Sequence, residues 1–397
     1  MKSKIFTVFL NFVCVICLLS VLEVYVFAYS GDCSASSSDS VSWSIDTYKK
    51  VLTISGTGKM ESYLENSAPW YSYRYLFKSV IIEDGVTNVG WYAFYDCDNL
   101  ISIEIPNSVT IICRNAFEAC SNLENMKIPS SVTCIDYKAF YGCTKLKSVI
   151  FADDSHLTRI EESAFSSCIN LTSMEIPDGV TYIGKSAFFN SQSLTNVTFG
   201  ENSQLISIGN VAFSDCSSLS SIKIPDSVIS IGSQAFRVCS SLESIEIPNS
   251  VTSIGSYAFS GCSKLSTVYY TGTQEQWNKI SIGSSNDPLF NAEMVFFGKE
   301  ICFEIPKLPA EVESATVLLA TYDENGVFTG FIEKTVSATD TETTFTVDTR
   351  TGETYKIFVF DVFGKLMPLC ENVQGDIKKC FDTLLETGCV FAFSASK

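Results

Sequence analysis

The cysteines are the residues of this sequence with the most obvious chemistry, because thiols form disulfides, bind metals and act as nucleophiles. Seven of them stand at one fixed place, three residues after a phenylalanine: Cys97, Cys120, Cys143, Cys168, Cys216, Cys239 and Cys262. This regular spacing predicts a column of parallel side chains, which is poor geometry for disulfides. Free cysteine also packs as a small apolar residue. We therefore predict a buried ladder of thiols.

Other cysteines leave alternatives open: Cys113 and Cys134 in the repeats could form a bridge, and so could Cys380 and Cys389 in the tail. Metal binding is not predicted. The repeated cysteines form no Cys-x-x-Cys pair, and no histidine partners stand beside them.

The remaining polar residues offer little for catalysis. His156 is the only histidine, which argues against a His-based triad or a multi-His metal site. The segment Gly56-Thr57-Gly58 lacks the third glycine and the following helix of a phosphate-binding loop. Glu61 and Glu65 are two of 44 acidic residues and single out no glycosidase pair. We predict a protein that is not an enzyme and that uses no cofactor.

The charge of the chain limits its partners. Its formal net charge is −17, so it lacks the clustered Lys and Arg that nucleic acids and anionic membranes require. An apolar fraction of 46% is ample for a core and disfavours wholesale disorder. A protein ligand therefore remains the expected partner.

The N-terminus has the pattern of an export signal. Lys2 and Lys4 precede the apolar residues 5–22, and Val26-Phe27-Ala28 offers small residues at the usual cleavage spacing. We expect residues 1–28 to be a signal peptide and the mature chain to be secreted or held at the cell surface. The alternative is an uncleaved N-terminal membrane anchor, because the apolar run is about long enough to span a bilayer.

An internal repeat dominates the middle of the chain. The dipeptide Ala-Phe recurs at steps of 23 or 25 residues, with the phenylalanines at Phe94, Phe117, Phe140, Phe165, Phe188, Phe213, Phe236 and Phe259. A leucine follows each phenylalanine by six residues, and an aliphatic residue precedes it by five. Such a fixed period predicts stacked copies of one supersecondary unit.

Each unit begins with a short strand. In one copy Leu242, Ile245 and Ile247 alternate with polar residues, and a period of two predicts a strand with one buried face. Pro248 then ends the strand, because proline cannot donate to a sheet.

The second half of the unit returns the chain to the start of the next strand. Gly255 is expected to adopt a conformation that is closed to residues with a Cβ. Ala258, Phe259 and Cys262 have helical spacing and predict a single helical turn. One unit cannot bury its own apolar face, so we predict a repeat solenoid with one short parallel strand plus a helical turn per 23–25 residues.

The outward strand positions and two longer turns are the candidate ligand-facing surface. The strand candidates are Glu104, Lys127, Glu175, Lys223, Glu246 and Tyr269. Glu104 beside Lys127, and Lys223 beside Glu246, would be favourable neighbours between coils. Two copies are longer by two residues, at 151–156 and 199–204, where both insertions would bulge on the same edge. The candidates in these insertions are Asp153, Asp154 and Glu201.

The consensus Ile-Pro-x-Ser-Val-Thr-x-Ile-Gly-x-x-Ala-Phe-x-x-Cys-Ser-x-Leu resembles the BspA-like class of leucine-rich repeats over about residues 77–297. Two flanks are similar to the caps of the same bacterial proteins: an N-terminal β cap with Trp43 and Trp70, and a closing cap with Trp277. The resemblance implies a cell-surface or secreted adhesin that binds host or matrix proteins.

The sequence thus divides into a signal peptide (1–28), an N-terminal β cap (29–76), a leucine-rich-repeat solenoid with its closing cap (77–298), a linker (299–310), a β-sandwich-like module (311–375) and a C-terminal tail (376–397). In the module, residues 314–322 and 328–336 bracket Asp323-Glu324-Asn325-Gly326 and predict a hairpin.

Three functions are carried forward. The first is an extracellular protein-binding or adhesion protein that presents its repeat surface. The alternative is a structural spacer of the cell envelope with recognition in the C-terminal β module. The third is carbohydrate recognition by aromatic residues near the N-terminal cap, such as Trp70, Tyr71 and Tyr73.

Overall fold

The structure, a computed structural model, describes residues 28–304, 314–322, 328–337, 340, 342–348, 354–361 and 393–394. The predicted signal peptide, except for Ala28, lies outside these residues, as do Cys380 and Cys389. Within them, no helix combines the length and the apolar character needed to cross a bilayer.

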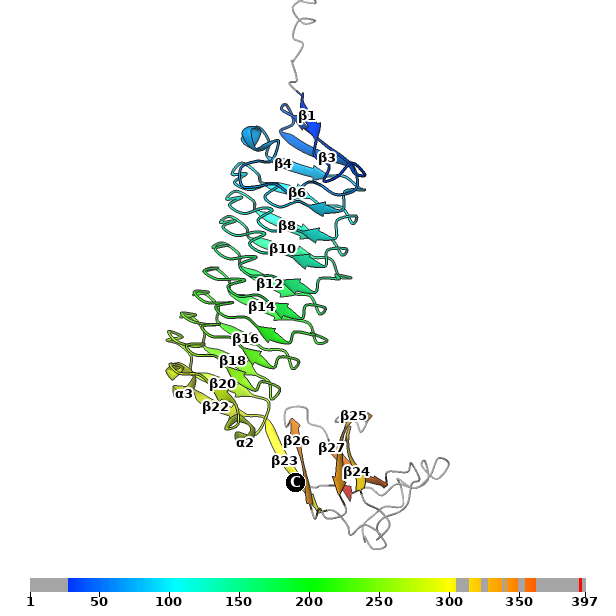
Figure 1. Ribbon diagram of the computed structural model, residues 1–397. Coiled ribbons are helices and arrows are strands. Elements are labelled where there is room, and N and C mark those ends of the chain that lie inside the picture. The colour runs from blue at the N-terminus through cyan, green and yellow to red at the C-terminus, as the bar shows by residue number, and fades with distance from the viewer. Residues whose placement is uncertain are drawn as a thin grey trace, which may run out of the picture.

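The repeats form an elongated stack of coils, one above the next (Figure 1). Each coil contributes one longer strand to the first face: β4 (Ser79–Ile82), β6 (Ser102–Glu104), β8 (Asn125–Ile128), β10 (Ser148–Phe151), β12 (Ser173–Ile176), β14 (Asn196–Phe199), β16 (Ser221–Lys223), β18 (Ser244–Ile247), β20 (Thr267–Tyr270) and β22 (Glu293–Phe296). We call the outer side of these strands the strand face. The paired strands run parallel, as the repeat predicts.

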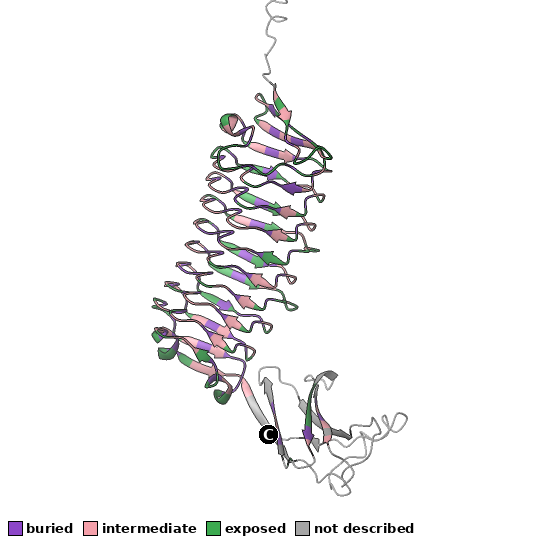
Figure 2. Ribbon diagram, viewed as in Figure 1, coloured by how far each residue is buried: buried purple, intermediate pink, exposed green. Residues whose placement is uncertain are grey.

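A second, continuous parallel sheet is built from two-residue strands: β5 (Asn88–Val89), β7 (Ile111–Ile112), β9 (Cys134–Ile135), β11 (Arg159–Ile160), β13 (Tyr182–Ile183), β15 (Ser207–Ile208), β17 (Ser230–Ile231), β19 (Ser253–Ile254) and β21 (Ser281–Ile282). The core lies between the two sheets, and buried and exposed residues alternate along the longer strands (Figure 2). In β8, Met126 and Ile128 are buried while Asn125 and Lys127 are exposed. The leucine-rich-repeat β-solenoid predicted from the sequence is therefore confirmed.

The predicted helical turn around each Ala-Phe pair is wrong. The segment is a series of tight turns with two positive-φ residues four positions apart. In the first coil these are Tyr92 (φ 53°) and Asp96 (φ 55°). Phe94 N–H and Asp96 N–H donate to the carbonyls of Ala116 and Glu118 in the next coil, at 2.8 and 2.9 Å. A helix would direct these donors back along its own axis. Bonding between coils therefore replaces bonding within a helix.

The repeated phenylalanines form a continuous stack at the centre of the solenoid. Neighbouring rings from Phe94 to Phe259 lie 5.1–5.5 Å apart with interplanar angles of 1–12°. All of these rings are fully buried. The stack joins each coil to the next, so the stability of one coil depends on its neighbours.

The repeated cysteines form the predicted buried ladder, and the structure shows what each thiol does. From Cys120 onward, each Sγ–H donates to the carbonyl of the phenylalanine in the preceding coil, at 3.0–3.2 Å. Ser191 stands where the repeat has cysteine, and its hydroxyl donates to the Phe165 carbonyl at 3.1 Å. A hydroxyl can therefore replace the thiol. Cys113 and Cys134 are both free, so they form no bridge.

The glycine after the short strand is needed for space and not for its backbone freedom. Gly255 does not adopt a positive φ. A Cβ at this position would lie 2.3 Å from the Ser233 nitrogen of the preceding coil. The expected special conformation is wrong, because the constraint comes from the close approach of two coils.

Different structures close the two ends. At the N-terminal end, β1 (Ala28–Asp32), β2 (Ser40–Asp46) and β3 (Val51–Thr57) are antiparallel, and β3 pairs in parallel with β4. The short 3₁₀ helix η1 (Tyr71–Tyr73) follows Trp70. At the other end, α2 (Gln274–Trp277) begins with a capping box at Thr273, and α3 (Asp287–Asn291) follows.

Trp70 belongs to the core and cannot serve as the predicted sugar platform. It is fully buried, stacks on Phe94 with ring centres 5.6 Å apart, and donates Nε1–H to the Ala93 carbonyl at 2.6 Å. It therefore extends the phenylalanine stack toward the N-terminal end.

The C-terminal strands form two antiparallel sheets. β23 (Gly298–Glu304) pairs with β26 (Glu342–Asp348), while β24 (Ser314–Tyr322) lies between β25 (Phe328–Ser337) and β27 (Thr354–Asp361), with β28 (Phe393–Ser394) beyond. The predicted hairpin is confirmed as β24 and β25. The predicted β-sandwich is not supported, because the described residues establish strand pairing and no packing of one sheet on the other.

Candidate functional site

The strand face is not one continuous sheet. Its hydrogen-bonded groups are β1-β2-β3-β4-β6, β8-β10, β12-β14 and β16-β18-β20-β22. The second sheet runs unbroken through nine strands over the same coils. The strand face therefore opens at three places while the rest of each coil stays joined.

Two of the three openings follow the two longer repeats. β10 ends at Phe151 and β14 ends at Phe199, where the two insertions begin. At the same place in regular coils, Ile128, Ile176, Ile224 and Ile247 are buried, while Ile105, beside the third opening, is half-buried. Phe151 and Phe199 are only half-buried, so each long coil leaves an aromatic ring at the rim of an opening.

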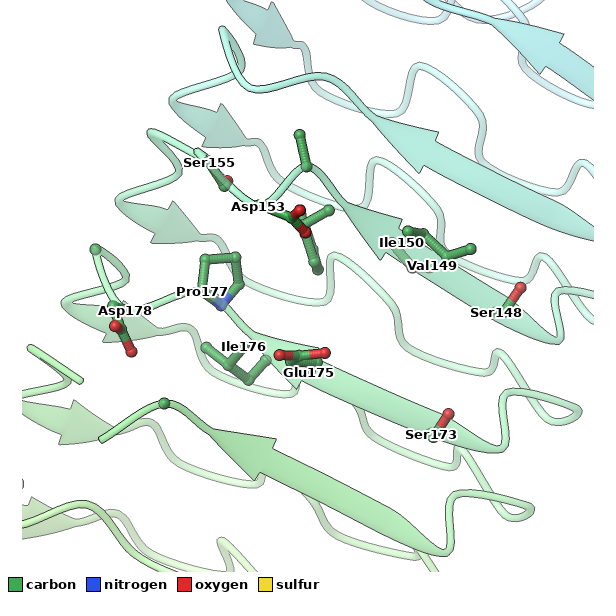
Figure 3. Close-up of a pocket in the computed structure, with 14 residues that line it drawn as sticks. Ser148, Val149, Ile150, Asp153, Ser155, Ser173, Glu175, Ile176, Pro177 and Asp178 are labelled. Carbon is green, nitrogen blue, oxygen red and sulfur yellow. The ribbon is translucent and has the colours of Figure 1, made fainter. Parts of the chain in front are cut away.

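The first hollow lies between β10 and β12 and has a volume of about 400 Å³. Ile150 and Phe151 line it from β10, Glu175 from β12, and Asp153 and Asp178 from the turns that follow these strands (Figure 3). Among the described residues, no Lys or Arg lines it. The first hollow therefore combines apolar surface with three carboxylates, a setting that favours a cationic group.

The second hollow lies between β14 and β16 and has a volume of about 620 Å³. Thr198 and Phe199 line it from β14, Lys223 from β16, and Glu201 and Asp226 from the turns. These are the repeat positions that line the first hollow, two coils further along. Lys223 stands where the first hollow has Glu175, so the two hollows share repeat positions and differ in volume and charge.

Asp178 lies in the wall of the first hollow, beside the residue with which the second insertion continues, Gly200. Its Oδ1 is buried and has no hydrogen-bond partner in the described part of the chain. A Cβ at Gly200 would lie 2.0 Å from this oxygen, so a larger residue there would displace the Asp178 carboxylate. The wall of the first hollow is thus set by a residue of the second insertion.

The structure brings together four of the predicted ligand-facing residues at the hollows: Asp153 and Glu175 at the first, Glu201 and Lys223 at the second. Asp154 is exposed but lines neither. Glu104 and Lys127 are exposed elsewhere on the strand face, and Glu246 and Tyr269 are half-buried there.

Only one of the two predicted charge pairs forms. Lys223 Nζ lies 3.5 Å from Glu246 Oε1, between the bonded strands β16 and β18. Because Lys223 is 69% exposed, such a pair is worth less than about 1 kcal/mol. Within the described residues Glu104 and Lys127 form no ion pair, because β6 and β8 fall in separate hydrogen-bonded groups.

The sequence placed the insertions but not the openings beside them. One signal was present: both long copies carry phenylalanine followed by Ala152 or Gly200, where regular copies carry Ile-Pro. In the sequence, Phe151 and Phe199 belong to the insertions, and the structure shows that they also line the hollows. The structure adds them to the candidate site.

Comparisons with known proteins agree with the fold. The model of the BspA-type leucine-rich-repeat region, in six copies, matches residues 69–168 and 158–286. A comparison with curated proteins finds no match.

Solved structures of similar chains include three from different bacteria. A leucine-rich-repeat protein of Bacteroides ovatus is 27% identical, with 64% of this chain and 69% of that chain covered and a TM-score of 0.47. A leucine-rich cell surface protein of Faecalibacterium prausnitzii is 24% identical (63% and 98% covered, TM-score 0.30). A leucine-rich-repeat protein of T. pallidum is 24% identical (61% and 82% covered, TM-score 0.34). On the match of the family model, which spans more than half of its length, the chain belongs to the BspA-type leucine-rich-repeat family.

Proposed function

We propose that this protein is an extracellular adhesion protein that binds a protein ligand on its strand face, centred on the two hollows. The observation that carries the proposal is the pair of hollows lined by the same repeat positions, two coils apart, in an otherwise regular polar surface. Two sites on one rigid array can engage two points of the same ligand, which raises affinity without any larger single contact.

The chemistry of the hollows supports a protein ligand. Small-molecule sites are mostly apolar and bury most of their ligand. These hollows lie on the surface and mix serine, aspartate and glutamate with one partly exposed phenylalanine each. A central aromatic residue within a polar rim is typical of protein interfaces. The same polar makeup supports a binding role without catalysis.

Export is part of the proposal. The charged and apolar pattern of residues 1–28 is typical of a signal peptide, which would carry the chain out of the cell. The buried thiols are compatible with this location, because each is enclosed by its coil and protected from an oxidising exterior.

The test removes both hollows while keeping the array. In the variant, residues 151–156 and 199–204 are each replaced by Ile-Pro-Asn-Ser, the sequence of residues 247–250, so both long coils become regular. Binding of the full chain to a panel of matrix and serum proteins is measured by biolayer interferometry. We expect the variant to keep its melting temperature and to lose at least tenfold in affinity for the protein that the wild type binds.

The matched control is Asn107→Ser, which gives residues 105–108 the Ile-Pro-Ser-Ser sequence of residues 128–131 at an exposed position that lines neither hollow. It should bind as the wild type does. Unchanged affinity in the double replacement would exclude the hollows as the site. Binding that survives removal of whole coils, in register, would favour the structural spacer with recognition in the C-terminal β module.

A further inference from the structure

A second surface, on the Ala-Phe turns of the first three coils, has a different composition. We call it the aromatic–cation strip, and it consists of Trp91, Arg114, Tyr137, Lys138 and Tyr141. Trp91, Arg114 and Tyr137 occupy one repeat position, three residues before the stacked phenylalanine, in successive coils. In later coils this position is held by Glu162, Lys185, Asn210, Ser233 and Ser256. The strip is therefore confined to the N-terminal coils.

Rings and cations alternate along the strip. The Arg114 guanidinium carbon lies 5.7 Å from the ring centre of Trp91 in the preceding coil and 5.0 Å from that of Tyr137 in the next. Lys138 Nζ lies 5.4 Å from the Tyr137 ring centre and 4.9 Å from that of Tyr141. Cations held over rings at these distances are attracted by the ring quadrupole. Arg114 is thus held in place from both sides.

The two cations differ in their partners. Lys138 Nζ lies 3.9 Å from Glu118 Oε1. Arg114 is exposed, and within the described chain its guanidinium forms neither a hydrogen bond nor an ion pair. This is notable in a chain with 44 acidic and 27 basic residues. Arg114 keeps its N–H donors available to a ligand.

We propose that the aromatic–cation strip binds an acidic segment of a partner protein, with a carboxylate of that segment on Arg114. A guanidinium presents its donors in a planar fork that matches a carboxylate with two parallel hydrogen bonds. Stacking fixes the side chain beforehand, which lowers the entropy lost on binding. Flanking apolar groups of the segment would contact Trp91 and Tyr137, whose residue types, with arginine, predominate in the energetic centres of protein interfaces.

The strip fits a protein segment better than a polysaccharide. A sugar stacks on an open ring face, and here a cation already lies over Trp91, Tyr137 and Tyr141. A sulfated polysaccharide needs a cluster of cations. The strip offers two, and one of them is engaged by Glu118. A single carboxylate flanked by apolar side chains needs neither an open ring face nor a cluster of cations.

The experiment selects peptides from a random 12-residue display library against the full chain and measures the affinity of those enriched. We expect enrichment of Asp or Glu beside apolar residues, and at least a tenfold loss of affinity in both Arg114→Gln and Arg114→Lys, since lysine lacks the fork. Arg237→Gln is the control. Arg237 is exposed on the Ala-Phe turn of a later coil and, in the described structure, lies over no ring. Melting temperatures of all variants should match the wild type.

Tryptophan fluorescence places the peptide. Of the four tryptophans, Trp43, Trp70 and Trp277 are buried, and Trp91 is 45% exposed. Acrylamide quenching therefore reports mainly on Trp91, and a bound acidic peptide should reduce it. The proposal is overturned if the enriched peptides lack acidic residues, if Arg114→Gln binds them as the wild type does, or if quenching is unchanged. Heparin binding that depends on Arg114 would assign the strip to a polysaccharide instead. None of these outcomes depends on the two hollows.

Discussion

Raising the pH from 8 to about 10 is expected to unfold the repeat array. Burial raises the pKa of every thiol of the ladder above its ordinary value of 9.0, to about 12 for Cys262, the last of them. The others are Cys97, Cys120, Cys143, Cys168, Cys216 and Cys239. In the unfolded chain the same thiols ionise near pH 9, so unfolding releases protons above that pH. Stability is therefore full below about pH 9 and falls as the pH rises.

The expected loss is large because the thiols act together. One pH unit above its unfolded pKa, each thiol contributes about 1.4 kcal/mol to the loss, or about 10 kcal/mol for seven. Whole domains are stable by roughly 5–15 kcal/mol. Melting curves followed by circular dichroism from pH 7 to 10.5 measure the effect.

The control replaces all seven thiols by serine, the residue that position 191 already carries in the same hydrogen bond. A serine hydroxyl does not ionise in this range, so the alkaline transition should move to a higher pH. If wild type and variant lose stability at the same pH, the thiols are not the cause.

Phe188→Ala is expected to cost about 3–5 kcal/mol, because it empties the middle of the phenylalanine stack. The Phe188 ring is fully buried and lies 5.5 Å from Phe165 and 5.2 Å from Phe213. Its sequence neighbour Phe189 is half-buried on the same turn. Phe189→Ala should therefore cost much less. Urea unfolding of both variants gives the comparison, and equal losses would mean that the stack adds nothing beyond ordinary apolar burial.

The sequence correctly predicted the features that depend on the residues of one coil alone. The strand in Leu242–Ile247 follows from its period of two, and the buried thiols follow from their fixed place after phenylalanine. What failed depended on the neighbouring coil. The spacing of Ala258, Phe259 and Cys262 suits a helix, but alternate donors of this segment leave the coil. Tyr257 N–H donates to the Ser284 carbonyl, and Phe259 N–H donates to Asn286 Oδ1. Gly255 is required by the backbone of Ser233, which lies one coil away.

The openings of the strand face also depend on contacts between neighbouring coils, so the sequence did not predict them. Whether β10 pairs with β12, or β6 with β8, depends on how two neighbouring coils meet, which no pattern within one repeat records. The sequence therefore located the insertions at 151–156 and 199–204, and the structure was needed to show that hollows lie beside them.

The most direct test of the binding site is hydrogen exchange of the full chain, with and without the panel protein that it binds. The proposal predicts slower exchange on binding in residues 148–155, 173–179, 196–203 and 221–227, which line the two hollows. The short strands of the second sheet, such as β11 and β13, should be unchanged. Protection confined to residues 301–397, with none at the hollows, would contradict the proposal that the strand face holds the ligand.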